Sequence, residues 1–321
     1  MTKALITGIA GFAGGHLAEH LLEDGWEVAG LDRGGASLAS LEKVGVRISV
    51  EECDIVNAGG VARVLETLKP DVVFHLAATS FVPSAEEAPQ TAFDINVKGS
   101  LNILEGCHRH IPRARIVLIS SATVYGAVPP EKMPLTEDHP ASPMNFYTLT
   151  KLCAEDLSRY YHRVHALPVV ILRPFNHIGP RQSRSFVTSS FAFQIAEIEA
   201  GKRAPVLNVG NLDAARDFTD VRDMVRAYRL AAEKCGAGQV YNICSGRAHT
   251  IREILQRMLR LTRARIEISE DAQRLRKSDI PLLYGDYSRF MGATGWKPEH
   301  DIDATIGEIL DYWRDEVHLT L

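Results

Sequence analysis

A glycine-rich turn near the start of the chain constrains the fold more than any other feature of the sequence. Three glycines directly follow the apolar segment Ala4–Thr7, and a helical pattern over Phe12–Glu23 begins inside their turn. Glycine lets a backbone turn tightly and approach a pyrophosphate, and a helix N-terminus offers N–H groups and a positive dipole end. An ordinary strand-to-helix turn is the alternative, but this context favours dinucleotide binding. The predicted cofactor-binding residues of the turn are Gly8, Gly11, Phe12, Ala13 and Gly14.

The first half of the chain alternates short apolar runs with longer helical patterns. This alternation predicts βαβ units and a Rossmann-like, doubly wound parallel sheet of the α/β class. Uninterrupted apolar runs such as Ile116–Ile119 fit strands that are covered on both faces. The expected strands are Ala4–Thr7, Glu27–Leu31, Arg47–Val50, Val72–Leu76, Arg115–Ser120 and Pro168–Leu172, and the expected helices are Phe12–Glu23, Asn57–Leu68, Ala92–His108 and Phe146–Val164.

The regular alternation weakens after Arg173, which indicates a second, smaller unit. Expected helices here are Phe186–Glu199, Val221–Glu233 and Ile251–Leu261, and expected strands are Val206–Val209 and Val240–Ile243. We predict a smaller C-terminal substrate domain that is interleaved with the last elements of the sheet. Residues 1–173 and about 212–249 are assigned to the dinucleotide-binding domain, and about 174–211 and 250–321 to the substrate domain.

Composition excludes several classes of protein. The net charge is −4, from 36 basic and 40 acidic residues, which gives no reason to expect nucleic acid or a membrane surface as a partner. Five cysteines without a CxxC pair indicate neither a disulfide framework nor a metal site. The chain opens without a leader pattern, and no apolar run approaches the ~18 residues of a membrane helix. We therefore expect a cytoplasmic protein.

The ends of the second and third predicted strands carry candidate cofactor contacts. Asp32 suits ribose hydroxyls, which favours NAD, whereas Arg33 suits a 2′-phosphate, which favours NADP. NADH and NADPH both stay open as the cofactor. Asp54 and Ile55 are placed to flank an adenine; alternatively, Asp54 caps the helix that begins near Asn57.

A tyrosine and a lysine four residues apart form the candidate catalytic pair. On a helix, Tyr147 and Lys151 share one face. A nearby ammonium group favours the phenolate and lowers the pKa of a tyrosine, so that it exchanges protons near neutral pH. Ser121 follows a predicted strand at the carboxyl edge of the sheet, where doubly wound folds bind ligands, and is placed to bind the same oxygen. Two unrelated surface residues and a serine in a turn are the alternative.

These motifs resemble the extended short-chain dehydrogenase/reductase family over essentially the whole chain. The glycine turn, His75-Leu76-Ala77-Ala78, Asn96, the Ser–Tyr–Lys set and Arg173-Pro174-Phe175-Asn176 fall in the order of that family. The resemblance implies that Ser121, Tyr147 and Lys151 form the catalytic group. It also implies cofactor contacts at Leu76, Ala77, Ala78, Asn96, Tyr147, Lys151 and Phe175.

Three segments of the second half resemble the GDP-4-dehydro-6-deoxy-D-mannose reductases: Arg173–Pro180 with Gln182-Ser183, Val209–Asp223, and Thr294–Pro298. The related GDP-mannose 4,6-dehydratases carry an acid two residues after the catalytic hydroxyl, where this chain has Thr123. Such an acid helps to remove water across C5 and C6 of the sugar, so keto reduction is favoured. Two features depart from the reductase pattern. Thr148 and Thr150 stand where many relatives have Gly and Ser, and Ser-Ala-Thr-Val-Tyr-Gly is a spelling common in sugar 4-epimerases.

Several side chains of the second half suit a nucleotide diphosphate. Guanidinium groups bind diphosphate oxygens, and Arg216 is favoured because it lies in a reductase-like segment, although each arginine alone is more often a surface residue. The other arginines considered are Arg181, Arg184, Arg274 and Arg276. Asp279 suits ribose hydroxyls, and Phe186 with Val187 suits the base or simply packs at a helix start. The predicted substrate-binding residues are Ser121, Asn176, Phe186, Val187, Arg216, Arg276 and Asp279.

These observations predict an NAD(P)H-dependent reduction of GDP-4-dehydro-6-deoxy-D-mannose to GDP-D-rhamnose. The main alternative is a nucleotide-sugar 4-epimerase; a 4,6-dehydratase and a non-catalytic NAD(P)-sensing protein are less favoured. The resemblance also implies a homodimer, with Ala92–His108 and Phe146–Val164 as candidate interface helices.

Overall fold

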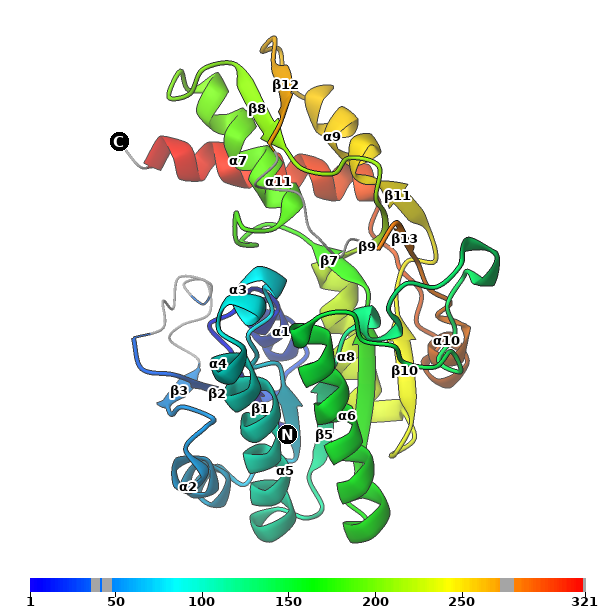
Figure 1. Cartoon of the computed structure of the whole chain (residues 1–321). Helices are drawn as coiled ribbons and strands as arrows, with labels where there is room; N and C mark the ends of the chain where they lie inside the picture. Colours follow the sequence, from blue (N-terminus) through cyan, green and yellow to red (C-terminus); the bar gives the residue numbers. More distant parts are fainter. Residues whose placement is uncertain (36–40, 42–47, 272–279, 320–321) are drawn as a thin grey trace.

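The main sheet consists of seven parallel strands in the order β10-β6-β5-β4-β1-β2-β3 (Figure 1). The structure, a computed structural model, describes residues 1–35, 41, 48–271 and 280–319. The strand order reverses between β1 and β4, which is the switch point where ligands bind in doubly wound folds. The strands are β1 (Lys3–Thr7), β2 (Glu27–Asp32), β3 (Ser49–Glu52), β4 (Val72–His75), β5 (Arg115–Ile119), β6 (Val169–Pro174) and β10 (Val240–Ile243).

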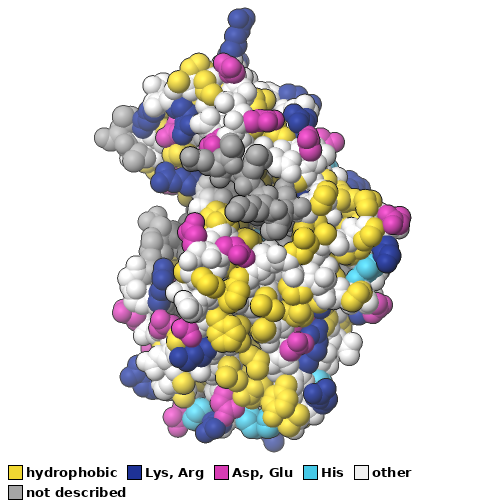
Figure 2. Space-filling model, in the orientation of Figure 1, with side chains coloured by type: hydrophobic (Ala, Val, Ile, Leu, Met, Phe, Trp, Pro, Cys, Tyr) yellow, Lys and Arg dark blue, Asp and Glu magenta, His cyan; other side chains and the backbone are white. Residues whose placement is uncertain are grey.

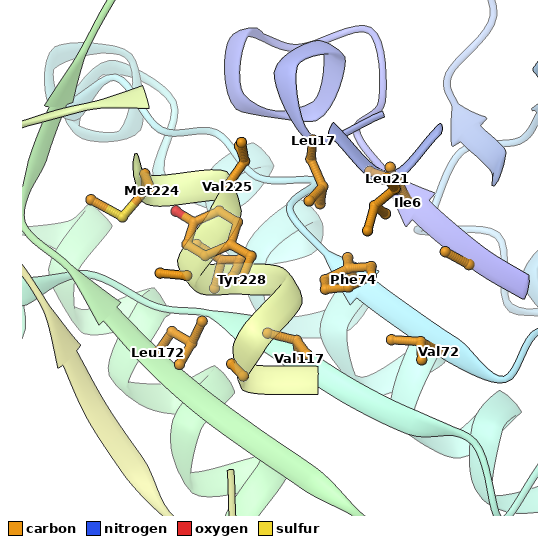
Figure 3. Packing of buried hydrophobic residues seen from close by; sticks show 14 of the residues in the cluster. Ile6, Leu17, Leu21, Val72, Phe74, Val117, Leu172, Met224, Val225 and Tyr228 are labelled. Atoms are coloured by element: carbon orange, nitrogen blue, oxygen red, sulfur yellow. The ribbon is translucent and has the colours of Figure 1, made fainter. Parts of the chain in front are cut away.

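Helices cover both faces of this sheet, as the sequence predicted. On one face, α1 (Phe12–Glu23) and α8 (Val221–Lys234) pack over the strands through a core that includes Leu17, Phe74 and Tyr228 (Figure 3). On the other face lie α2 (Ala58–Leu68), α5 (Gly99–His110) and α6 (Phe146–His165), with a core that includes Ile103 and Ile171. Burial of both faces explains why the strands are almost continuously apolar. The predicted fold class is confirmed.

The predicted helix over Ala92–His108 is broken into three pieces. The structure has α4 (Pro89–Phe93), a π-helical turn η3 (Asp94–Lys98) and α5. A preceding short helix, α3 (Val82–Glu87), joins this segment to β4. Periodicity of about 3.6 residues does not distinguish a π turn from an α turn, and π turns commonly occur at functional sites.

Asparagine side chains cap the N-termini of α2 and α6. Asn57 Oδ1 accepts the Gly60 N–H at 3.0 Å, so Asn57 caps α2. The alternative that Asp54 is this cap was wrong: Asp54 Oδ1 accepts the Val56 N–H at 2.9 Å, two residues further on, within the turn. Asn145 likewise caps α6 by accepting the Thr148 N–H at 2.9 Å.

The smaller part of the molecule has a core of its own. Ile195, Leu207, Phe218, Ile254 and Ile309 are among the residues buried in it. Figure 1 shows this part above the main sheet, with α7 and α11 side by side. Its elements are β7 (Asn176–Ile178), α7 (Val187–Glu199), β8 (Val206–Val209), β9 (Ala215–Asp220), β11 (Ala248–Thr250), α9 (Ile251–Leu259), β12 (Glu267–Glu270), β13 (Leu282–Leu283) and α11 (Ile302–Leu319).

The chain crosses between the two parts more than once. After β9 it enters α8 and β10 of the main sheet, and then returns to the small sheet at β11. Further on, α10 (Ser288–Thr294) packs against β10 and α8. The short 3₁₀ turns η4 (Ala122–Tyr125) and η5 (Pro130–Lys132) lie between β5 and α6. The interleaved arrangement that the sequence predicted is present, and the exact domain boundaries remain a prediction.

Candidate active site

The glycine turn forms a close-packed cradle at the start of α1. Gly8 has a φ of +71°, and a Cβ at this position would lie 2.9 Å from the Ala77 backbone. A Cβ at Gly14 would lie 2.3 Å from Gly8 O, and one at Gly11 would lie 3.1 Å from the same oxygen. Among the described residues, no side chain caps α1, whose N-cap is Gly11. The turn therefore presents backbone amides at a helix N-terminus, which is the chemistry that binds a pyrophosphate.

Asp32 holds the glycine turn from the end of β2. Its Oδ2 accepts the Ala10 N–H at 2.9 Å, and its Oδ1 accepts the Arg33 N–H at 2.9 Å. A carboxylate has further lone pairs, so these two bonds leave acceptor capacity for ribose hydroxyls. Arg33 is exposed beside it. The structure thus places both residues that were predicted to discriminate NADH from NADPH at the same strand end.

A buried histidine connects β1, β4 and α5. His75 Nδ1 lies 2.8 Å from Thr7 Oγ1, and His75 Nε2 lies 2.9 Å from Ser100 Oγ. Thr7 Oγ1 accepts the Ala77 N–H at 3.2 Å. Burial, with a smaller effect of Lys151, lowers the pKa of His75 to about 3, so the ring is neutral. This network fixes the Leu76–Ala78 loop, which was predicted to line the cofactor.

Asn96, on the π turn, joins that loop to the catalytic helix. Its Oδ1 accepts the Thr79 N–H at 2.8 Å, and its Nδ2 donates to Thr79 O at 3.2 Å and to Thr150 Oγ1 at 2.9 Å. Thr150 in turn donates to Tyr147 O at 2.7 Å. These bonds give Asn96 a positioning role in the described structure, while the predicted contact with the cofactor remains a prediction.

Ser121, Tyr147 and Lys151 come together at the carboxyl edge of the sheet. Ser121 follows β5, and Tyr147 and Lys151 lie on successive turns of α6, all three with exposed fractions below a tenth. A hydrogen bond with Ser121 lowers the pKa of Tyr147, but burial raises it more strongly, to about 12. Burial also lowers the pKa of Lys151 to about 8, against the opposing effect of Glu155. The expectation of a lowered Tyr147 pKa was therefore wrong for this structure, because burial of the phenol dominates.

A buried ion pair fixes the catalytic helix against the sheet. Glu155, one turn beyond Lys151, accepts two hydrogen bonds from Arg173 in β6 and one from Ser120 Oγ, the last at 2.6 Å. The Arg173 guanidinium also lies 4.8 Å from the centre of the Tyr125 ring. With a further hydrogen bond from Arg159 Nη2 at 2.7 Å, the buried carboxylate has four donors, and the pair fixes the position of Lys151 relative to the sheet.

The predicted substrate residues occupy different environments. Asn176 is exposed on β7, and Phe186 precedes α7 with its ring 5.9 Å from that of Phe81. Val187 begins α7, and Arg216 lies half-buried on β9, where it donates to Ala215 O at 2.9 Å. Arg274, Arg276 and Asp279 lie outside the described residues.

Two further arginines that were considered for the substrate have partners in the protein. Arg181 donates two hydrogen bonds of 2.6 Å to Glu19 of α1, and its φ of 73° holds the chain in a left-handed turn. Arg184 lies 5.2 Å from the centre of the Phe193 ring. The Glu19 pair ties the segment after β7 to the helix that begins at the glycine turn.

The remaining predicted cofactor residues are placed as follows. Asp54 is exposed after β3, and Ile55 is buried against Gly99, where its side chain fills the space that a Cβ would need. Phe12 stacks on His177 with ring centres 5.8 Å apart. Phe175 is buried in a small cluster that includes Ala122 and Tyr125. Their contacts with a cofactor remain predictions.

Sequence reasoning missed two buried acids, Glu155 on α6 and Asp217 on β9. Asp217 accepts hydrogen bonds from Ser245 N and Oγ, both at 2.7 Å, and from Gly246 N at 2.9 Å. Burial raises its pKa to about 6 despite these bonds. Asp217 therefore anchors the loop after β10 to β9. The neighbouring Arg216 drew attention to the segment, but the donors come from distant positions and gave no local signal.

The sheet, the glycine cradle and the Ser–Tyr–Lys group together define a short-chain dehydrogenase/reductase. The model of the GDP-mannose 4,6 dehydratase family matches residues 5–309 of the chain. The chain therefore belongs to the GDP-mannose 4,6-dehydratase family, and the predicted resemblance is confirmed.

Individual relatives show how broad the similarity is. The GDP-6-deoxy-D-mannose reductase of Pseudomonas aeruginosa is 34% identical over 319 residues, which is 99% of each chain. A solved structure of RMD from the same organism, complexed with NADPH, has a TM-score of 0.87 at 33% identity and covers 98% of this chain and 100% of that one. The UDP-glucose 4-epimerase of Thermotoga maritima, solved with UDP-glucose, has a TM-score of 0.90 at 26% identity, with 98% and 100% covered.

Proposed function

We propose that the protein reduces the 4-keto group of GDP-4-dehydro-6-deoxy-D-mannose to give GDP-D-rhamnose, with NADH or NADPH as the reductant. The observation that carries the proposal is the burial of Ser121, Tyr147 and Lys151 together at the carboxyl edge of a doubly wound sheet. Similarity to a GDP-6-deoxy-D-mannose reductase along 99% of the chain supports the substrate class.

The chain offers the binding surface that a nicotinamide dinucleotide needs. Any side chain at Gly8 or Gly14 would collide with backbone atoms, so the space in front of the helix is kept for close backbone approach. Asp32 lies where the adenosine ribose would meet the end of β2. Similarity to a structure solved with NADPH supports the same class of cofactor. When bound, the cofactor supplies the hydride.

The residues of the chain handle the proton. Tyr147 donates its phenolic proton to the oxygen that becomes the C4 hydroxyl, and Ser121 donates a hydrogen bond to the same oxygen. The Lys151 ammonium stabilises the phenolate that results, in a buried site where electrostatic effects are strong. Because burial raises the pKa of Tyr147 to about 12, the phenol stays protonated until a substrate carbonyl is in place, as a general acid requires.

The side chain at position 123 argues against dehydration. Thr123 Oγ1 lies 2.8 Å from Ser121 Oγ, where the related dehydratases carry an acid. A threonine hydroxyl at neutral pH does not assist elimination of water as a carboxyl group does.

A nucleotide-sugar 4-epimerase is the second candidate. The Ser-Ala-Thr-Val-Tyr-Gly spelling and the TM-score of 0.90 with a UDP-glucose 4-epimerase favour it. An epimerase oxidises and re-reduces the same carbon, so it consumes no cofactor over a complete cycle.

Absorbance of the reduced nicotinamide separates the two candidates. Purified protein is mixed with GDP-4-dehydro-6-deoxy-D-mannose, once with NADH and once with NADPH. If the amount of nicotinamide oxidised, measured as loss of absorbance, equals the amount of sugar reduced, the reductase is supported and the preferred cofactor is identified. Absence of loss with both cofactors overturns this substrate assignment, and isomerisation of other nucleotide sugars without net consumption supports the epimerase.

An apolar face over α4, α5 and α6 supports the proposal of a homodimer. Figure 2 shows hydrophobic side chains gathered over this face. The larger exposed apolar residues there are Phe93, Leu101, Met144, Leu149, Tyr160 and Val164. Contiguous patches of this kind commonly mark an interface. Leu149→Glu with Val164→Glu should convert a dimer into a monomer in analytical ultracentrifugation, and a wild-type monomer would overturn the proposal.

The division of labour between the two parts is also proposed. Residues 1–173 and about 212–249 hold the dinucleotide, and about 174–211 and 250–321 hold the nucleotide sugar through Asn176, Phe186 and Val187, together with Arg276 and Asp279. Arg216, within the interleaved segment 212–249, is a further contact of the sugar. The exposed Asn176 and the position of Arg216 on β9 support this assignment.

Among the described residues, no helix is long and apolar enough to cross a membrane, and all five cysteines are free. The free thiols support a cytoplasmic location.

A further inference from the structure

A chain of hydroxyl groups continues from Ser121 to the start of α6. Ser121 Oγ lies 2.8 Å from Thr123 Oγ1, and Thr123 Oγ1 lies 3.3 Å from Thr148 Oγ1. Thr148 Oγ1 lies 2.8 Å from Asn145 Oδ1. Thr148 is fully buried and follows Tyr147 directly on the first turn of the helix. The hydroxyls therefore connect the helix cap with the catalytic serine.

Counting protons gives the resting direction of this chain. Asn145 Oδ1 accepts the Thr148 N–H at 2.9 Å, which identifies this atom as the amide oxygen. Because an amide oxygen has no proton to donate, the hydroxyl of Thr148 must donate its single proton to Asn145 Oδ1. Ser121 Oγ accepts the Thr123 N–H at 3.2 Å. In the protein alone, the Thr148 proton therefore lies on Asn145 and not on Thr123, the more distant acceptor at 3.3 Å, while between Ser121 and Thr123 either hydroxyl can donate.

We propose that Thr148, Thr123 and Ser121 form a reversible hydroxyl chain that turns toward the substrate carbonyl when the sugar binds. Thr148 rotates its proton from Asn145 to Thr123, Thr123 then donates to Ser121, and Ser121 donates to the carbonyl oxygen beside Tyr147. Every hydroxyl keeps its own proton and no heavy atom moves. Asn145 Oδ1 continues to accept the hydrogen bond from the Thr148 N–H. Tyr147 alone releases a proton, to the developing alkoxide.

The chain strengthens the hydrogen bond that Ser121 makes to the reacting oxygen. A hydroxyl that accepts a hydrogen bond becomes a better donor, and such polarisation is larger in a buried site. Thr148 touches neither substrate nor reacting atoms in this account, so it is a positioning residue that acts through Thr123. The inference rests on the proposed function, because it requires a carbonyl group at this place.

A double-mutant cycle tests whether Thr148 acts through Thr123. Thr148→Val removes the hydroxyl and keeps the shape, and we expect kcat to fall about three- to tenfold, with KM and the cofactor Kd changed by less than about twofold. Thr148→Ser should restore kcat. In a Thr123→Val background, Thr148→Val should cause no further loss. An equal loss in both backgrounds would overturn the chain, because Thr148 would then act by another route.

A matched variant separates this effect from a loss of helix stability. Ser158 is also fully buried on α6 and donates to Ala154 O at 2.9 Å, away from the site. Ser158→Ala should lower the midpoint of thermal unfolding without the fall in kcat; a fall equal to that of Thr148→Val would overturn the positioning role.

The cycle can be measured on whichever keto or hydroxy nucleotide sugar the protein turns over. If another nucleotide sugar is converted in place of the GDP-keto sugar, the proposed function fails while the cycle still tests the hydroxyl chain. If the GDP-keto sugar is reduced and the two substitutions are additive, only the hydroxyl chain fails. A wild-type protein that converts no nucleotide sugar would overturn both.

Discussion

Arg173 holds Glu155 by two hydrogen bonds, from Nε to Oε1 at 2.9 Å and from Nη2 to Oε2 at 2.7 Å. Both side chains are buried, and Glu155 lies one helical turn beyond Lys151. The pair joins β6 to α6, so it determines how the helix that carries Tyr147 and Lys151 sits on the sheet. The catalytic geometry therefore depends on a contact that no reacting atom touches.

Glu155→Gln should destabilise the fold strongly, because it leaves the Arg173 guanidinium buried without a counter-charge. Breaking a buried pair from one side costs about 3–5 kcal/mol, measurable by urea unfolding. Arg159→Met is the matched control: Arg159 also donates to Glu155 at 2.7 Å, but its side chain is 36% exposed, so its loss should cost less than about 1 kcal/mol. Equal losses in the two variants would contradict the structural role of the Arg173 contact.

The pKa of Lys151 predicts a specific pH dependence. Burial lowers it from 10.5 to about 8, so the folded protein loses this proton above about pH 8, while the unfolded chain keeps it to about pH 10.5. Between these values the unfolded state binds more protons, and the contribution of Lys151 to the free energy of unfolding rises with pH. Lys151→Met should remove this rise, and wild-type kcat/KM should fall above about pH 8. Identical pH slopes of unfolding in wild type and variant would show that the lysine is not perturbed in this way.

Tyr147→Phe should leave cofactor binding intact and remove most turnover. The substitution deletes the phenolic proton donor and little else, and general acid catalysis contributes roughly 10²–10⁴-fold. Cofactor affinity is measured by quenching of tryptophan fluorescence, and turnover by nicotinamide absorbance. Near-normal turnover would remove Tyr147 from the mechanism.

Gly14→Ala should weaken cofactor binding by at least about tenfold. The new Cβ would lie 2.3 Å from Gly8 O, so the glycine turn would have to open. Gly292→Ala is a suitable control, because a Cβ there meets nothing within 4 Å and the site lies on α10, away from the turn. Unchanged cofactor affinity in Gly14→Ala would show that the cradle is not the binding site.

Signals that are local in the sequence predicted the sheet well, and they predicted that Tyr147 and Lys151 lie on one helix. The glycine turn adjoins its strand and its helix, and Tyr147 and Lys151 are one helical turn apart, so spacing alone is informative. Uninterrupted apolar runs likewise identified β5 and β6, because both faces of these strands are buried.

Features that depend on distant partners were not predicted. β9 has the polar sequence Ala-Arg-Asp-Phe-Thr-Asp and is a strand because it pairs with β7, β11 and β13. Asp217 is satisfied by donors 28 and 29 residues away. The pKa of Tyr147 depends on burial, which the spacing to Lys151 does not report. For Asn96, the resemblance indicated importance, but only the structure shows its bonds to Thr79 and Thr150.

Transfer of deuterium from the reduced cofactor tests the central claim most directly. Protein and GDP-4-dehydro-6-deoxy-D-mannose are incubated with NADH or NADPH deuterated at the transferred position, and the product is examined by mass spectrometry and NMR. The account predicts a GDP-deoxyhexose with one deuterium on C4. The Tyr147→Phe variant should fail to form this product. A product without deuterium on C4, or an isomerised sugar with the cofactor unconsumed, would contradict reduction at that carbon.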